Sequence, residues 1–244
     1  MPESLALTRL LNQLFGGPVT SMLNALGVHP HHPEAPITNA FALELLIAAL
    51  LLTFFIVVRA TLSVEKPAPA QQFAEMIHEF VGGQAEQIIG HDYTQFQSFI
   101  TMVFLFILSC NLIGLIPGIN SPTEIPAVPL GIAIPTFLYY NFYGFKSNGL
   151  FGYLKQFAGP VWWLSWLLFP IEVISHLARI MSLSVRLYAN MFAGGLVTLV
   201  FFSLVPVGVP VVFLGLHLMV SVIQAFVFML LVTIYLSLAV SHDH

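Results

Sequence analysis

Apolar segments long enough to cross a lipid bilayer fill most of this chain, and they constrain its fold more than any other feature. Residues 40–62 are apolar except for Glu44 near one end and Arg59 near the other. As a helix rising about 1.5 Å per residue, this segment covers a hydrocarbon core of about 30 Å. Only 7% of the 244 residues are charged and 58% are hydrophobic, so the chain lacks the polar side chains that a water-facing surface needs. We therefore expect an all-α, polytopic membrane protein whose main solvent is the lipid bilayer.

Four more apolar segments bring the expected number of transmembrane helices to about five. The segments are separated by stretches rich in proline, glycine, asparagine or serine, which are typical of loops. The last two segments are the longest, and we expect them to be tilted in the membrane. The four segments cover residues 96–116, 130–145, 161–202 and 211–240.

The run at residues 161–202 is about 60 Å long as one helix, which is twice the thickness of the bilayer core. Pro170 kinks a helix without reversing it, and no turn-forming residues accompany Gly194 and Gly195. The first clear turn signal is at residues 205–210, where two prolines flank a glycine. We therefore expect one long helix before this turn.

Residues 1–39 are expected to form an N-terminal amphipathic and linker segment, and residues 40–244 a membrane domain. Leucines at helical spacing predict a surface helix that stops at residues 16–18, Gly-Gly-Pro. An apolar stripe at residues 73–80 predicts a second surface helix. Metal binding is disfavoured in the linker, because its prolines keep the backbone extended and no Cys or carboxylate pair completes a site. The linker histidines are His29, His31 and His32.

Basic residues are few and scattered, which argues against nucleic acid binding and also sets the orientation. The net charge is −4, whereas binding to phosphate backbones needs clustered Lys and Arg. Lys and Arg accumulate in cytoplasmic loops, and the loop at residues 118–129 has none. We expect the N-terminus outside and the C-terminus in the cytoplasm. The residues expected on the cytoplasmic side are Arg59, Lys66, Lys146 and Lys155.

Each of the last two apolar helices carries one polar stripe. At 100° per residue, six polar residues of the first helix fall within an arc of about 120°. A charged side chain in a transmembrane segment costs at least about 2.5 kcal/mol on insertion scales, so it indicates a functional site. The stripes consist of Glu172, His176, Arg179, Ser182, Arg186 and Asn190 on the first helix, and of His217, Ser221 and Gln224 on the second.

Arg186 is the hardest of these residues to explain by packing. It has no acidic residue within a helical turn, so its counter-charge must come from another helix or another chain. The other polar residues have structural alternatives. Glu172 and Arg179 could form a structural polar cluster, and Asn190 and Gln224 could join two helices through amide hydrogen bonds.

Three ordered motifs resemble subunit a of the rotary F-type ATP synthase. Residues 182–194, Ser-Leu-Ser-Val-Arg-Leu-Tyr-Ala-Asn-Met-Phe-Ala-Gly, look like its arginine motif. Residues 224–228, Gln-Ala-Phe-Val-Phe, resemble the motif on its last helix, and residues 111–117, Asn-Leu-Ile-Gly-Leu-Ile-Pro, are similar to the end of an earlier family helix. Order, spacing, length and topology agree with this family over about residues 40–240.

The resemblance implies a non-catalytic, proton-translocating stator subunit of the bacterial inner membrane, without a cofactor. It would press against a rotating ring of c subunits, each with one mid-membrane carboxylate, and contact peripheral-stalk helices of subunit b. Arg186 would face the ring carboxylate. Because guanidinium stays protonated, it favours the ionised carboxylate and relays no proton itself. The proton path implied by the same resemblance includes Asn190, His217 and Gln224 on the outer side, and Glu172 and Ser182 toward the inner side. His176 is a further residue of this path.

The chain departs from this family pattern at Gly195, where several members carry an acid or a histidine. We hypothesise that His217, with water in the space that Gly195 leaves, replaces the missing relay.

Three other classes of membrane protein are alternatives to this interpretation. A haem-binding subunit would use His176 and His217 as axial ligands, although His176 is also explained as a hydrogen-bonded packing residue. A self-contained channel or transporter would need an acidic partner for Arg186 within this chain. A membrane metalloprotease is disfavoured, because the sequence has no His-Glu-x-x-His motif.

Overall fold

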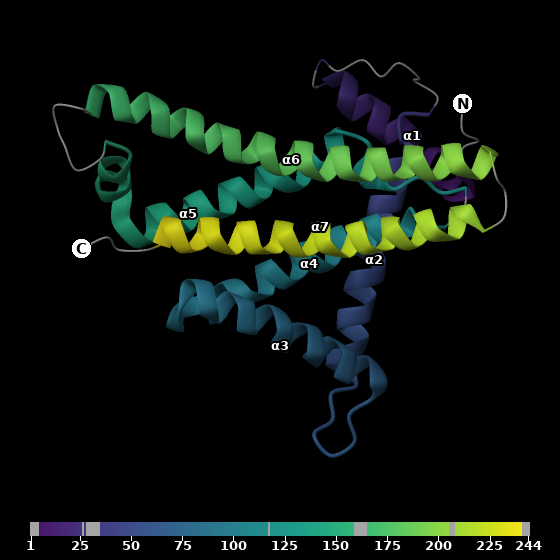
Figure 1. Ribbon diagram of the computed structural model, residues 1–244, viewed down its shortest axis with the longest axis horizontal. Coiled ribbons are helices and arrows are strands. Elements are labelled where there is room, and N and C mark those ends of the chain that lie inside the picture. Colours follow the sequence, from purple (N-terminus) through teal and green to yellow (C-terminus); the bar gives the residue numbers. More distant parts are fainter. Residues whose placement is uncertain are drawn as a thin grey trace.

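The computed structural model of the chain describes residues 5–25, 27, 35–116, 118–158, 165–204 and 208–240. The regular elements in this part of the chain are all helices, which confirms the all-α prediction. In chain order (Figure 1) they are α1 (Ala6–Ala25), α2 (Asn39–Ala60), α3 (Pro69–Ile89), the 3₁₀ helix η1 (His91–Tyr93), α4 (Thr94–Ile113), the 3₁₀ helix η2 (Pro122–Glu124), α5 (Ala127–Ala158), α6 (Ser165–Leu204) and α7 (Val209–Val240).

Four of the described helices are long and apolar enough to cross a membrane, whereas the sequence predicted about five crossings. The four are α2, α4 with η1, α6 and α7. The predicted span at residues 130–145 lies in α5, where tyrosines, Asn141 and Pro135 dilute the apolar residues. Gly149, with φ of 70°, breaks the same helix near its end. α5 instead packs along α6 and α7, where protein covers part of its polar surface.

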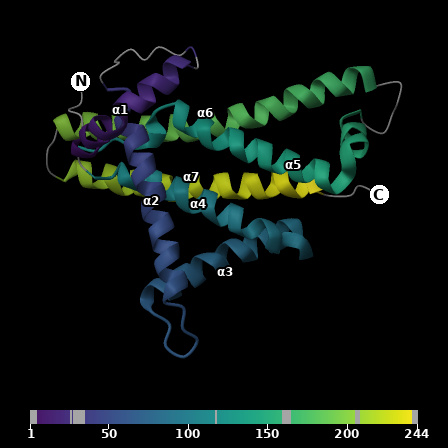
Figure 2. The ribbon, with the colours of Figure 1, turned by 180° about the vertical axis from the view of Figure 1, so that it is seen from behind.

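α6 and α7 form an antiparallel pair along the long axis of the molecule, and α2 runs at a steep angle to them (Figures 1 and 2). α6 is one helix of 40 residues, as the sequence predicted. Pro170 lies in its second turn, so the proline disturbs only the start of the helix. α6 ends at Leu204 and α7 begins at Val209. Residues 205–207 of the predicted turn lie outside the described residues.

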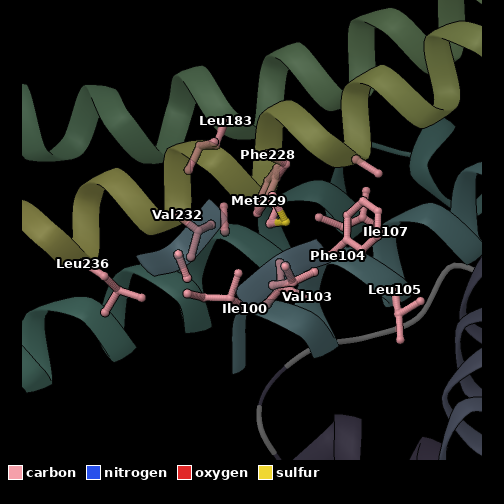
Figure 3. Packing of buried hydrophobic residues seen from close by; sticks show 14 of the residues in the cluster. Ile100, Val103, Phe104, Leu105, Ile107, Leu183, Phe228, Met229, Val232 and Leu236 are labelled. Atoms are coloured by element: carbon pink, nitrogen blue, oxygen red, sulfur yellow. The ribbon is translucent and has the colours of Figure 1, made fainter. Parts of the chain in front are cut away.

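The hydrophobic core lies where α7 packs on α4. Phe228, Met229 and Val232 of α7 lie against Ile100 and Val103 of α4 (Figure 3). α6 contributes much less to this core. In its most apolar stretch of 18 residues, 11% is buried within the chain, compared with 56% in the corresponding stretch of η1 and α4. Lipid or another subunit must therefore cover most of α6.

The first helix is longer than the sequence predicted. α1 continues through residues 16–18 to Ala25, so the Gly-Gly-Pro sequence does not end it. The hydroxyl group of Thr20 donates a hydrogen bond to the carbonyl oxygen of Gly16 at 2.8 Å, and Gly16 is buried beside Pro36. The packing of Gly16 beside Pro36 supports the helix at this point. The linker with His29, His31 and His32 lies outside the described residues, as does the tail at 241–244.

The predicted helix at residues 73–80 lies within α3, which packs on α4 through a buried glycine. The amide nitrogen of Gln97 donates to the carbonyl oxygen of His78 at 2.7 Å. This places the Gln97 side chain directly against Gly82, where a Cβ atom would collide with it. Gly83, the next residue, has open space around the same position.

These two adjacent glycines provide a test of the α3–α4 packing. We expect Gly82→Val to destabilise the protein by about 1–3 kcal/mol, because overpacking forces side chains out of favourable positions. Gly83→Val is the control, since it changes helix propensity equally without a clash. The measurement is the thermal melting of each purified variant in detergent. Equal melting temperatures for the two variants would contradict the described packing.

Candidate functional site

The predicted polar stripe of α6 divides into separate groups in the folded chain. At the start of α6, Glu172 lies 3.4 Å from Arg179 and 3.4 Å from His176. His176 Nδ1 is 3.4 Å from the hydroxyl group of Tyr140 on α5, and the Arg179 guanidinium lies over the ring of Tyr235 on α7. These contacts join α5, α6 and α7, so this part of the stripe helps to hold the three helices together.

Arg186 lies near the middle of α6 and is exposed. In the described part of the chain, no acidic side chain lies within ion-pair distance of its guanidinium. Ser182 is exposed one turn before it, and Ala189 and Ala193 are exposed on the same helical face. The Arg186 cation thus lies on a helix face with small side chains. The rest of the described chain does not cover this face.

Asn190 and Gln224 are brought together by the pairing of α6 with α7. The amide nitrogen of Asn190 donates to the side-chain oxygen of Gln224 at 2.8 Å. Gln224 is buried, while Asn190 is exposed on the side of α6 that carries Arg186. The pair therefore reaches from the helix interface toward the uncovered face.

A buried polar network ties η2 to α4 and α7. The hydroxyl group of Thr123 donates to Asn111 Oδ1 at 2.8 Å, and Asn111 Nδ2 donates to the carbonyl oxygen of Ser221 at 3.3 Å. Ser121 packs so closely on Gly114 that a Cβ atom there would lie 2.7 Å from its own Cβ. The loop between α4 and α5 is thereby fixed against the α6–α7 pair.

Two consecutive glycines of α6 make room for two titratable side chains. A Cβ atom at Gly194 would lie 3.2 Å from His217 Nδ1, and one at Gly195 would lie 2.6 Å from Glu124 Oε1. His217 is buried, and its Nε2 has no hydrogen-bond partner among the described residues. Gly195, His217 and Glu124 line one cavity of about 380 Å³.

Glu124 is the member of this site that the sequence pattern does not predict. Its carboxylate lies in the space beside Gly195, where the sequence-based hypothesis places water. Burial raises the pKa of this carboxyl group above its usual value, and a hydrogen bond from the Ser121 backbone partly opposes the effect. The signal in the sequence was a single acid in a loop otherwise without charge at residues 114–129.

The structure excludes a shared haem between the two histidines of the α6–α7 pair. His217 lies against Gly194, and the eighteen residues from there back to His176 correspond to about 27 Å along a helix. One iron cannot bind both side chains. A self-contained transporter would need an acidic partner for Arg186, and the described residues provide none.

Fold and site together define a class: an all-helical, polytopic membrane protein with a mid-helix arginine beside a line of polar side chains. Comparison with known proteins gives the family. The family described as ATP synthase A chain matches residues 41–237, and the chain belongs to this family.

Relatives extend this match over the whole chain. ATP synthase subunit a of Koribacter versatilis is 54% identical over 244 residues, covering all of both chains. The protein of the same name from Solibacter usitatus is 46% identical over 223 residues, 91% of this chain and 96% of its own. The one from Bdellovibrio bacteriovorus is 42% identical over 181 residues, 72% and 79% of the two chains.

The Asn190–Gln224 hydrogen bond can be tested without reference to activity. We expect Asn190→Ala and Gln224→Ala each to destabilise the α6–α7 pair, with a coupling energy of about 0.6 kcal/mol in a double-mutant cycle. Unfolding of the single and double variants in detergent measures this coupling. Additive effects of the two substitutions would show that the side chains do not interact.

Proposed function

We propose that this chain is the stator subunit of the proton channel in the membrane sector of a rotary ATP synthase. It couples proton translocation to rotation of a c-ring, and thereby to ATP synthesis, without catalysing a reaction itself. The observation that carries this proposal is the exposed Arg186, which has no acidic partner among the described residues. In lipid an uncompensated cation is costly, so its counter-charge must come from another subunit.

The face around Arg186 suits a closely packed helical partner. Ala189 and Ala193 are exposed beside it, and small residues allow helix backbones to approach closely in membranes. A ring of helices that each carry one carboxylate would bring that group to the guanidinium. This arrangement also explains why so little of α6 is buried within the chain.

Arg186 controls the protonation state of the rotor. Its permanent positive charge stabilises the ionised carboxylate that passes it, so a proton must leave before the ring can move past. Guanidinium does not release a proton at any working pH, so Arg186 also blocks direct flow between the two sides. Each proton that crosses a potential of 100 mV releases about 2.3 kcal/mol for rotation.

Two aqueous half-channels approach this arginine from opposite sides of the membrane. Asn190, Gln224 and His217 belong to the outer one, which the cavity lined by His217 supports. Glu172, His176 and Ser182 belong to the inner one, toward the start of α6. A proton therefore rides the ring between the two half-channels.

The orientation follows from the basic residues. Arg59 lies in the last turn of α2 and Lys146 lies late in α5, which favours the cytoplasm for these ends. The N-terminus is then outside. With α5 as the fifth crossing, the C-terminus is cytoplasmic. The bilayer is a bacterial inner membrane, and helices of the peripheral-stalk subunit b cover other apolar surface of the chain.

Replacing the arginine gives the central test of the proposal. Arg186→Ala is expected to abolish proton-driven ATP synthesis in vesicles that contain the complete enzyme, while the subunit still assembles. Arg179→Ala is the control on the same helix. It removes a cation that already pairs with Glu172, so most of the synthesis should remain. Normal synthesis by the Arg186→Ala enzyme would refute the proposal.

The role of His217 is tested separately. His217→Ala is expected to slow proton-driven synthesis, because it removes a titratable group from the outer cavity. The initial rate is measured over a range of pH on the outer side. His91→Ala, which changes an exposed histidine of η1 outside the proposed path, controls for loss of a histidine in general. A rate that equals the wild type at every pH would exclude His217 from the path.

A further inference from the structure

The outer end of the α6–α7 pair has a cavity with a carboxylate that neither helix provides. Between residues 165 and 240 the only acidic residue is Glu172, which lies near the start of α6 in the ion-pair cluster. The carboxylate beside Gly195 comes instead from Glu124, on the loop between α4 and α5. It lines the same cavity as His217 and Thr198.

The structure positions this carboxylate rather than leaving it at random in a loop. Its neighbour Thr123 is buried and donates a hydrogen bond to Asn111 of α4. Asn111 in turn donates a hydrogen bond to the backbone of α7. η2 also contacts α2, α5 and α6. On the other side, the missing side chain at Gly195 lets the carboxylate reach the backbone of α6.

We propose that Glu124 is the proton-relay carboxylate of the outer half-channel. In each cycle a carboxylate oxygen of Glu124 accepts a proton from a hydronium ion in the cavity, which leaves a neutral water molecule. The resulting carboxylic acid passes that proton to a water molecule or to the imidazole of His217, and the carboxylate is restored. No other covalent bond is made or broken, and the proton continues toward Asn190 and the rotor. This inference rests on the proposed function of the chain.

Three features of the site support a relay over a purely structural role. The carboxylate oxygens are not engaged by any described cation, so a change of protonation breaks no ion pair. The pKa of the carboxyl group is raised by burial, which brings it nearer to the pH at which a relay must both bind and release protons. His217 lies against Gly194, next to Gly195, and its buried Nε2 atom has no hydrogen-bond partner among the described residues.

The first experiment removes the titration and keeps the shape. Glu124→Gln in the complete ATP synthase, reconstituted in liposomes with an imposed proton gradient, is expected to lower the rate of ATP synthesis at least about tenfold. Glu124→Asp, which keeps a titratable group, should retain an intermediate rate. Glu86→Gln changes an exposed acid of α3 and should leave the rate unchanged.

The second experiment moves the carboxylate from the loop to α6. Glu124→Ala empties the space beside Gly195, so Glu124→Ala with Gly195→Glu is expected to recover a large part of the lost rate. Glu124→Ala with Gly195→Gln fills the same space without a titratable group and should not recover. A structural role would predict equal rates for the two double variants, and this outcome would overturn the relay.

The outcomes separate this inference from the function on which it rests. If Arg186→Ala abolishes synthesis while Glu124→Gln keeps the wild-type rate, the chain is the stator but Glu124 is not its relay. If Arg186→Ala itself keeps synthesis, the proposed function fails whatever Glu124 does. Immunoblots of the membranes report assembly for each variant, and if Glu124→Gln does not assemble, the two double variants decide.

Discussion

The cost of placing a polar group in lipid is the constraint on which this structure depends. Every polar side chain of α6 and α7 must find a partner, reach water or meet another subunit. The structure uses all three solutions along one helix pair. Glu172, His176 and Arg179 satisfy one another, Asn190 bonds to Gln224, and His217 lines a cavity. Arg186 has no acidic partner among the described residues, so another subunit must supply its counter-charge.

Glycines determine which polar groups come together, because they let side chains from other elements reach a helix backbone. Gly114 accommodates Ser121, which fixes the loop after α4. Gly194 and Gly195 then admit His217 from α7 and Glu124 from that loop. The outer cavity is thus assembled from three separate parts of the chain, and the absence of side chains at two positions is as important as the residues that fill it.

The helices themselves were largely predictable, because hydropathy and length are local properties of the sequence. The long run after residue 160 forms one helix as expected, since neither Pro170 nor Gly194 and Gly195 can reverse it. Where the structure differs from the sequence predictions, the causes are tertiary. α1 continues past the Gly-Gly-Pro sequence, where the buried Gly16 packs beside Pro36. α5 is less apolar than its neighbours, since protein contacts with α6 and α7 replace part of its lipid surface.

The sequence by itself determined that this chain lies in a membrane, that its last two helices are long, and that Arg186 has no nearby acid. These follow from composition and spacing, which a helix preserves. Only the tertiary structure decided which polar residues meet. Glu124 and Gly195 are seventy-one positions apart. His176 and His217 belong to the polar stripes of two neighbouring helices, yet they lie toward opposite ends of the helix pair. Such contacts depend on how whole helices pack, and the energy of that packing is spread over many apolar side chains that carry no motif.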